Sequence, residues 1–261
     1  AIALGALAAG VNLVAGYPGT PSSEILETIS KYRHDGVYIE WSVNEKAAME
    51  VAAAAAYSGA RAMVTMKQVG LNVAADPLMS LAYVGVKGGM VIVSADDPGP
   101  ISSQTEQDTR RFADFCRIPV FDPSSPEEAY KMIGEAFEYS EKYNTPVLFR
   151  PTTRVCHAYA SIDNCDSPSP KKYEGFVKDS KKWVISPRLS FANHIMIEKR
   201  NVEIGKDFST YSANKAEGVN SEKTVVTSGI SYAYTKECLK DYPNVKLIKI
   251  ATAYPFPEDF V

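Results

Sequence analysis

Six short runs of apolar residues, rich in β-branched side chains, recur along the first 150 residues. They are VNLVAG at 11–16, VYIEW at 37–41, AMVTM at 62–66, GMVIVSA at 89–95, IPVFD at 118–122 and TPVLFR at 145–150. Runs of this length without strict alternation are typical of strands that are buried on both faces of a parallel sheet. We therefore predict a six-stranded, mainly parallel sheet.

Stretches with helical spacing lie between these runs and open on cap residues. TPSSEILETISKY offers Ser22 or Ser23 as an N-cap, and SSPEEAYKMIGEAFEYSEKY offers Ser124 or Ser125. Hydroxyl side chains at such positions accept hydrogen bonds from the free N–H groups of a first helical turn. The alternation of strands and helices favours a doubly wound α/β domain, which we place at residues 1–160.

The regular alternation stops after the sixth run. Residues 161–221 contain the turn-rich stretch SPSPKK and a long polar segment without strong periodicity. We predict a connector here that is only partly ordered. A short helix at 190–199 is expected within it, because Phe191, Ile195 and Ile197 form a partial apolar stripe.

Residues 222–261 return to the earlier pattern. KTVVTSG, ISYAYTKECLKDY and VKLIKIATAYPFP indicate a strand, a helix and a strand, which we interpret as the opening βαβ unit of a second α/β domain. The chain begins with Ala1 rather than methionine and ends soon after the last strand. We therefore expect a fragment of a longer protein.

Composition argues against several classes of protein. Lys and Arg number 28 and Asp and Glu number 31, a net charge of -3 with no basic stripe, so we expect no nucleic-acid partner. No segment approaches the ~18 consecutive apolar residues of a membrane helix. The 4 cysteines are scattered without a Cys-x-x-Cys pair, which argues against a disulfide framework or an iron–sulfur site in this chain. We expect a soluble protein of the cytoplasm.

The loop GYPGTPSSE follows the first predicted strand, at a place where open parallel sheets bind ligands. Gly16 and Gly19 allow the backbone to approach a ligand, two prolines fix its path, and Thr20 places a hydroxyl ahead of a helix N-terminus. A rigid strand-to-helix turn with a serine cap would have the same composition. Both interpretations stay open on this motif alone.

Three further loops at predicted strand ends carry candidate chemistry. Glu45 stands at the head of an alanine-rich helix, where an acidic residue also complements the helix dipole. MKQVGLN follows the third run, and we expect Gly70 and Asn72 to start the next helix. The loop SADDPGPISSQTEQDTR after the fourth run is longer than a connection requires.

Together these stretches resemble the pyrimidine-binding domain of thiamine diphosphate enzymes over about residues 1–160. A narrower resemblance is to the alpha subunits of indolepyruvate:ferredoxin oxidoreductases, which are members of the 2-oxoacid:ferredoxin oxidoreductase family. It rests on five blocks in order: YPGTPSSE at 17–24, NEKAAMEVA at 44–52, TMKQVGLNVAADPLM at 65–79, VSADDPG at 93–99 and SSQTEQDTR at 102–110. Residues 222–261 resemble the start of the transketolase C-terminal-type domain of those subunits.

The resemblance implies roles for particular residues. The glutamate that aligns with Glu45 hydrogen-bonds N1′ of the aminopyrimidine ring and favours the tautomer that takes the C2 proton of the thiazolium. Thr20 would lie beside the thiazolium and the substrate. The other cofactor-binding positions implied are Tyr17, Pro18, Gly19, Gln68, Gly70 and Asn72. Position 68 is Gln where many relatives have His, so an imidazole role is lost there, although an amide still hydrogen-bonds.

For the intact enzyme the resemblance implies oxidative decarboxylation of an aryl 2-oxoacid such as indolepyruvate, with electrons passing to ferredoxin and the acyl group to coenzyme A. The implied cofactors are thiamine diphosphate with Mg²⁺ and [4Fe–4S] clusters, and the implied partners are a beta subunit and a second copy of the chain. This segment contains neither a Gly-Asp-Gly diphosphate motif nor clustered cysteines, so we expect it to be inactive alone. The alternatives are a non-redox thiamine diphosphate decarboxylase or synthase, and a catalytically silent scaffold subunit.

The remaining charged side chains favour structural interpretations. His34, His157 and His194 have no converging spacing, so we predict no metal site. Arg110 and Arg111 could reach a carboxylate, but we interpret this pair as surface charge at a helix end. Arg150 and Arg154, which flank PTT after the sixth run, are candidate anchors for a partner subunit.

Overall fold

The computed structural model describes residues 1–33, 35–163, 169–219 and 221–261. His34 and one of the 4 cysteines, Cys165, lie outside these ranges. Within the described ranges, no helix has both the length and the apolar composition that crossing a membrane would require.

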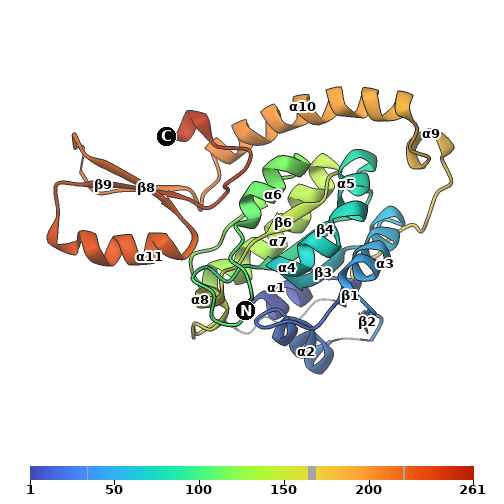
Figure 1. Cartoon of the computed structure of the whole chain (residues 1–261), viewed down its shortest axis with the longest axis horizontal. Helices are drawn as coiled ribbons and strands as arrows, with labels where there is room; N and C mark the ends of the chain where they lie inside the picture. Colours follow the sequence, from blue (N-terminus) through green and yellow to red (C-terminus); the bar gives the residue numbers. More distant parts are fainter. Residues whose placement is uncertain (34, 164–168, 220) are drawn as a thin grey trace.

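Strands and helices alternate through the first part of the chain (Figure 1). In chain order these elements are α1 (Ile2–Ala8), β1 (Leu13–Gly16), α2 (Ser23–Tyr32), β2 (Tyr38–Trp41), α3 (Glu45–Tyr57), β3 (Ala62–Lys67), α4 (Gln68–Val73), α5 (Ala75–Val84), β4 (Met90–Ala95), α6 (Thr109–Cys116), β5 (Val120–Phe121), α7 (Pro126–Tyr143), β6 (Val147–Phe149) and α8 (Thr153–Cys156). Each of the six predicted apolar runs coincides with one of these strands, and β3 extends one residue beyond its run, to Lys67.

The six strands form one parallel sheet in the order β2-β1-β3-β4-β6-β5. Successive side chains of a strand point to opposite faces, and the central strands are apolar on both. Val91 packs into the core under α1, α2 and α7, whereas its neighbour Ile92 packs into the core under α3, α5 and α6. Helices therefore cover both faces, and the predicted doubly wound α/β fold is confirmed.

The helix caps follow the local sequence. Asn44 accepts a hydrogen bond from the Ala47 N–H at 2.8 Å and begins α3, whose alanines favour a helix. Ser125 accepts from the Glu128 N–H at 3.2 Å and begins α7, so of the two predicted cap residues there, Ser125 is the one used.

The second part of the chain differs from the expected connector. Its elements are α9 (Ser180–Trp183), α10 (Pro187–Ser209), β7 (Lys215–Glu217), β8 (Thr224–Ser228), α11 (Gly229–Cys238), β9 (Lys246–Ile250) and the short 3-10 helices η1 (Leu239–Asp241) and η2 (Glu258–Phe260). The helix predicted at 190–199 is the 23-residue helix α10, which Ser186 caps by accepting from the Leu189 N–H. The prediction was therefore too short.

β7, β8 and β9 form a second sheet in the order β7-β9-β8. The parallel pairing of β8 with β9 across α11 confirms the predicted βαβ unit. β7 was not predicted, and it pairs antiparallel with β9. Figure 1 shows this sheet beside the first, with α10 running from the first sheet's helices towards it.

The chain after β9 joins the two sheets at the edge strand β5. The Val120 N–H donates to the Tyr254 carbonyl at 2.8 Å, and the Asp122 N–H donates to the Ala251 carbonyl at 2.8 Å. Backbone hydrogen bonds across this seam leave less of the β5 edge open to other strands.

Candidate active site

Strand order reverses at β1, because the chain passes from β1 to β2 on one side and returns to β3 on the other. Ligands of open parallel sheets bind at the carboxyl ends of the strands beside such a point. The segments that follow β1, β3 and β4 at this edge are the loop 17–22, helix α4 and the loop 96–108. Hydrogen bonds and close contacts, described below, join all three.

Two hydrogen bonds to serine hydroxyls hold the backbone of Gly19 in the loop after β1. The Gly19 N–H donates to the Ser23 hydroxyl at 2.8 Å, and the Ser22 hydroxyl donates to the Gly19 carbonyl at 2.8 Å. Ser22 occupies the N-cap position of α2 but accepts no cap hydrogen bond, so its hydroxyl stabilises the turn instead of capping the helix. The loop residues left exposed at the edge are Tyr17, Pro18 and Thr20.

Glu45 is half-buried at the first residue of α3. Its carboxylate lies against the backbone of Gly70, where an added Cβ would be 2.4 Å from Glu45 Oε1. Only a residue without a side chain allows this approach of α4 to the head of α3. The structure therefore brings Glu45 and Gly70, which the sequence placed on different loops, into direct contact.

α4 begins at Gln68 and not at Gly70 as expected. The Gln68 side chain is fully buried, and its Nε2 donates to the Thr105 carbonyl at 3.2 Å. Its Oε1 is buried without a hydrogen-bond partner among the described residues. Asn72 is exposed on α4, and no hydrogen bond joins it to the other candidate residues in the described part of the chain.

Lys67, at the end of β3, is a candidate site residue that sequence reasoning missed. Its Nζ donates to the carbonyl of Ser102 at 2.9 Å and to the hydroxyl of Ser102 at 3.0 Å. The Ser102 hydroxyl in turn donates to the Thr20 carbonyl at 3.4 Å. Lys67 therefore links the loop that carries Thr20 to the loop after β4.

Asp97 holds the loop after β4 in this position. Its carboxylate accepts hydrogen bonds from the Ile101 and Ser102 N–H groups at 3.0 and 2.9 Å, and from the hydroxyls of Ser103 and Thr153 at 2.9 and 3.0 Å. Burial opposes ionisation of Asp97, but these donors outweigh it and lower the pKa of the carboxyl to about 2. The loop is therefore anchored on an ionised side chain at neutral pH.

A buried ionic cluster lies beside this edge, at the ends of β4, β5 and β6. Arg150 is 5% exposed, and its Nε and Nη1 lie 2.7 Å from Asp96 Oδ2 and 3.4 Å from Asp122 Oδ1. Arg110 also reaches Asp122, at 3.4 Å, and donates to the Ser228 hydroxyl at 2.5 Å. The interpretation of Arg150 as an anchor for a partner is wrong because the side chain is buried, whereas Arg154 is exposed and its role stays a prediction. Arg110 is not simple surface charge, because it pairs with carboxylates of its own chain, as Arg150 does.

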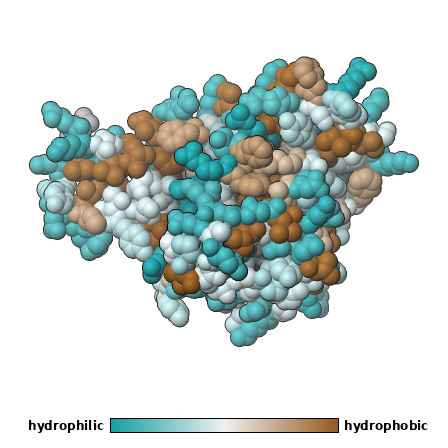
Figure 2. Space-filling view, in the orientation of Figure 1, coloured by the Kyte–Doolittle hydropathy of each residue, from teal (hydrophilic) through white to brown (hydrophobic). Residues whose placement is uncertain are grey.

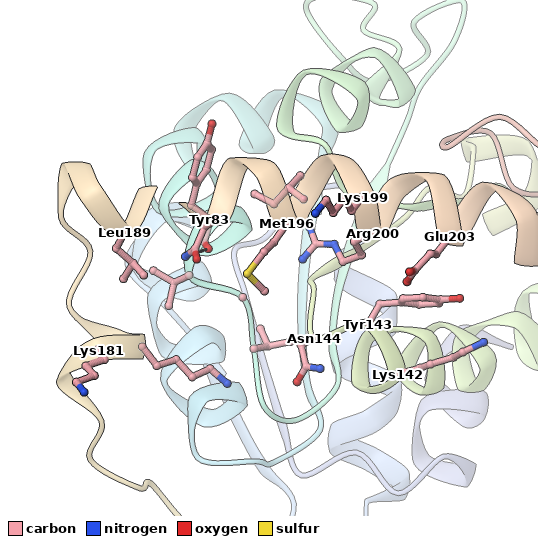
Figure 3. A pocket seen from close by; sticks show the side chains of 16 residues that line it. Tyr83, Lys142, Tyr143, Asn144, Lys181, Leu189, Met196, Lys199, Arg200 and Glu203 are labelled. Atoms are coloured by element: carbon pink, nitrogen blue, oxygen red, sulfur yellow. Dashed lines mark hydrogen bonds between the residues drawn. The ribbon is translucent and has the colours of Figure 1, made fainter. Parts of the chain in front are cut away.

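A cavity of about 690 Å³ lies elsewhere, between α10 and the C-terminal ends of α5 and α7 (Figure 3). Met196 and Arg200 come from α10, and Tyr143 and Asn144 come from the end of α7. Burial lowers the pKa of Arg200 to about 10. Since α5 and α7 lead into the starts of β4 and β6, this cavity is at the amino edge of the sheet, away from the candidate active site.

The family model described as pyruvate flavodoxin/ferredoxin oxidoreductase, thiamine diphosphate-binding, matches residues 4–224. The chain is 42% identical to the indolepyruvate oxidoreductase subunit IorA of Pyrococcus horikoshii and 44% identical to that of Thermococcus kodakarensis, in both cases over 98% of this chain and 41% of the subunit. It therefore spans about two fifths of the length of these curated relatives. These matches confirm the resemblance that the five sequence blocks indicated.

More distant comparisons agree. The chain is 25% identical to the 2-oxoglutarate synthase subunit KorA of Methanocaldococcus jannaschii, over 100% of this chain and 82% of that subunit. A solved 2-oxoglutarate:ferredoxin oxidoreductase from Magnetococcus marinus shares the fold, with a TM-score of 0.74 at 16% identity over 98% of this chain and 53% of the solved one. The chain belongs to the pyruvate flavodoxin/ferredoxin oxidoreductase, thiamine diphosphate-binding family.

Proposed function

We propose that the full-length protein is a thiamine diphosphate-dependent 2-oxoacid:ferredoxin oxidoreductase that acts on aryl 2-oxoacids such as indolepyruvate. This chain would supply the half of the site that binds the aminopyrimidine. One observation carries the proposal: the Glu45 carboxylate is packed against Gly70 beside the point where strand order reverses. The family membership and the similarity to indolepyruvate oxidoreductase subunits support it.

The polar groups at this edge fit an aminopyrimidine ring. Such a ring offers a basic nitrogen and an amino group, which pair with a proton-exchanging carboxylate and with a hydrogen-bond acceptor. Glu45 is the half-buried carboxylate, and the buried Oε1 of Gln68 is an acceptor without a partner among the described residues. A buried acceptor left unpaired costs about 1–3 kcal/mol, so a bound donor would stabilise this arrangement.

When bound, thiamine diphosphate supplies the carbon nucleophile on which a 2-oxoacid loses CO₂. Glu45 would exchange a proton with the ring nitrogen at its carboxylate, and Gly70 would leave room for that carboxylate. Gly19 and its two serine partners would hold Thr20 beside the substrate. Tyr17 and Pro18 would line the entrance at the exposed end of the same loop.

The remaining parts of the enzyme are proposed to come from outside these residues. They are the domain that binds Mg²⁺ and diphosphate, the [4Fe–4S] clusters, a beta subunit and a second copy of this chain, with ferredoxin and coenzyme A as co-substrates. Within this chain we propose a pyrimidine-binding domain at 1–160, a connector at 161–221 and the beginning of a second domain at 222–261. Figure 2 shows apolar surface over both the second sheet and α10. The exposed residues there include Val226, Phe191 and Met196, as association with another subunit would require.

The proposal is tested with the full-length protein and its partner subunit, purified without oxygen and supplied with thiamine diphosphate, Mg²⁺ and coenzyme A. We expect indolepyruvate to drive reduction of ferredoxin, with the acyl group recovered on coenzyme A. Release of the aldehyde without ferredoxin reduction would instead indicate a non-redox decarboxylase. An absence of turnover with any 2-oxoacid, together with failure to bind thiamine diphosphate, would indicate a scaffold subunit.

Substituting Gly70 with alanine is expected to lower kcat/KM by about 10²-fold, because the new Cβ would displace the Glu45 carboxylate or α4 by a fraction of an ångström or more. Affinity for thiamine diphosphate, measured by titration, should fall as well. Gly134→Ala in α7 is the matched control, since its Cβ would meet Ala9 Cβ at an ordinary 3.7 Å. Equal activity of the two variants would contradict the proposed packing of Glu45.

A further inference from the structure

Lys67 carries a positive charge that the described part of the chain does not neutralise. Its ammonium contacts are the two neutral oxygens of Ser102, and no ion pair joins it to a described carboxylate. Other lysines at the surface do pair, for example Lys46 with Asp76 at 2.9 Å. Lys67 is half-buried, so its charge is less well solvated than that of a fully exposed lysine.

Asp97, the carboxylate that binds the segment around Ser102, forms no ion pair with Lys67. Its Oδ2 accepts three hydrogen bonds from the loop, and its Oδ1 accepts one from the Thr153 hydroxyl. A lysine ammonium has three N–H donors, and Ser102 takes two of them. One donor therefore remains for a group that no described residue supplies.

The position of this ammonium identifies the kind of group. The Lys67 side chain packs along Gly19, where an added Cβ would be 3.3 Å from Lys67 Cβ, and Ser102 connects the ammonium to the carbonyl of Thr20. The charge therefore lies beside the loop that we propose to contact the substrate. Every 2-oxoacid carries a carboxylate next to its reacting carbonyl, and an ammonium with a free N–H donor matches such an anion.

We propose that Lys67 and Ser102 form the subsite that binds the carboxylate of the 2-oxoacid substrate. This inference rests on the proposed function and assigns a substrate contact to a residue that the sequence did not single out. Lys67 supplies charge and one hydrogen bond, and Ser102 orients the ammonium towards Thr20. Asp97 does not touch the substrate but is a positioning residue, because it fixes the loop that carries Ser102.

The test compares two ligands that differ in the carboxylate. Indole-3-lactate keeps the carboxylate of indolepyruvate but has no keto group to react, and tryptophol lacks the carboxylate. Binding of each to the full-length complex is measured by calorimetry for wild type, Lys67→Met, Lys67→Arg and Ser102→Ala. Lys31→Met, which removes an exposed lysine in the last turn of α2, is the control of equal charge.

We expect Lys67→Met to weaken binding of indole-3-lactate by about 10- to 100-fold and to leave tryptophol unchanged, since a hydrogen bond to a charged group contributes that much. Lys67→Arg should retain most of the preference for the carboxylate, and Ser102→Ala should lose a smaller part. KM for indolepyruvate should rise in Lys67→Met more than kcat falls. Lys31→Met should match wild type throughout.

Two results would overturn the proposal. One is unchanged binding of indole-3-lactate to Lys67→Met, and the other is an equal loss for both ligands, which a merely structural link between the loops would produce. Thermal unfolding of each variant identifies a loss of fold. Ferredoxin reduction is measured on the same wild-type preparation, so failure of the proposed function appears there, separately from the carboxylate preference in binding.

Discussion

Replacing Glu45 with glutamine in the full-length protein is expected to lower kcat by about 10²- to 10⁴-fold, the usual contribution of a positioned acid–base group. Glutamine keeps the size of the side chain beside Gly70, but it cannot exchange a proton with a ring nitrogen. The measurement is the steady-state rate of ferredoxin reduction at saturating cofactor. Exchange of the thiazolium C2 proton for deuterium, followed by NMR on the complex, should slow in parallel.

A matched variant separates chemistry from structure. Glu50 lies on the same helix but is exposed, so Glu50→Gln makes the same chemical change away from the edge of the sheet. We expect it to retain wild-type rates. If Glu45→Gln also turned over and exchanged the C2 proton at wild-type rates, the role assigned to Glu45 would be wrong.

Replacing Arg150 with methionine is expected to destabilise the protein by about 3–5 kcal/mol at pH 7, because it leaves buried charge without its partner. Asp96 and Asp122 are both 0% exposed and both contact Arg150. The measurement is the shift of the urea midpoint of the full-length protein. The loss of stability should affect the first domain and its contact with the second sheet.

The pH dependence of this loss has a definite sign. Burial raises the pKa of Asp96 and of Asp122 above the usual range, and removing Arg150 raises it further. In the variant the folded state therefore binds more protons than the unfolded state, and the loss should shrink as the pH falls from 7 towards 5. Arg111→Met, at an exposed position, is the control. An equal and pH-independent effect of both variants would contradict the account of this cluster.

Five of the six strands were predictable from sequence because they are largely buried on both faces and so form nearly continuous apolar runs. The edge strand β2 has no fully buried residue, and its run VYIEW includes a glutamate. The ends of the strands were harder to predict, since hydrogen bonding to the neighbouring strand decides where a strand stops. The run IPVFD gives a strand of only Val120–Phe121, because β5 is an edge strand whose neighbouring backbone groups bond in part to the chain after β9. That partner is 129 to 134 residues away in sequence and leaves no local signal.

α10 shows why the structure of the connector was harder to predict from the sequence. Its buried residues are Ile197, Asn201, Ile204 and Phe208, a stripe with helical spacing that contains a polar position. The stripe taken from the sequence included Phe191 and Ile195, which are exposed in the structure. The pattern was therefore followed at the wrong end of the helix, and the second half was left out.

Some residues of the candidate site were also predictable from local sequence features, and others were not. Glu45, Thr20 and the loop after β1 stood out because helix heads and Gly-Pro loops at strand ends are local features, and their roles stay predictions. Lys67 was not singled out and Arg150 was given the wrong role, because each is defined by a partner at another strand end, 35 and 54 residues away. The sequence does not show which distant residue will pair with a given lysine or arginine.

The most direct measurement is a structure of the full-length protein with thiamine diphosphate bound, in which the distance from the Glu45 carboxylate to N1′ of the aminopyrimidine is determined. The role assigned to Glu45 predicts a hydrogen bond of about 2.6–3.2 Å. A cofactor whose N1′ faces a different carboxylate, or that lies away from the carboxyl ends of β1 and β3, would contradict it.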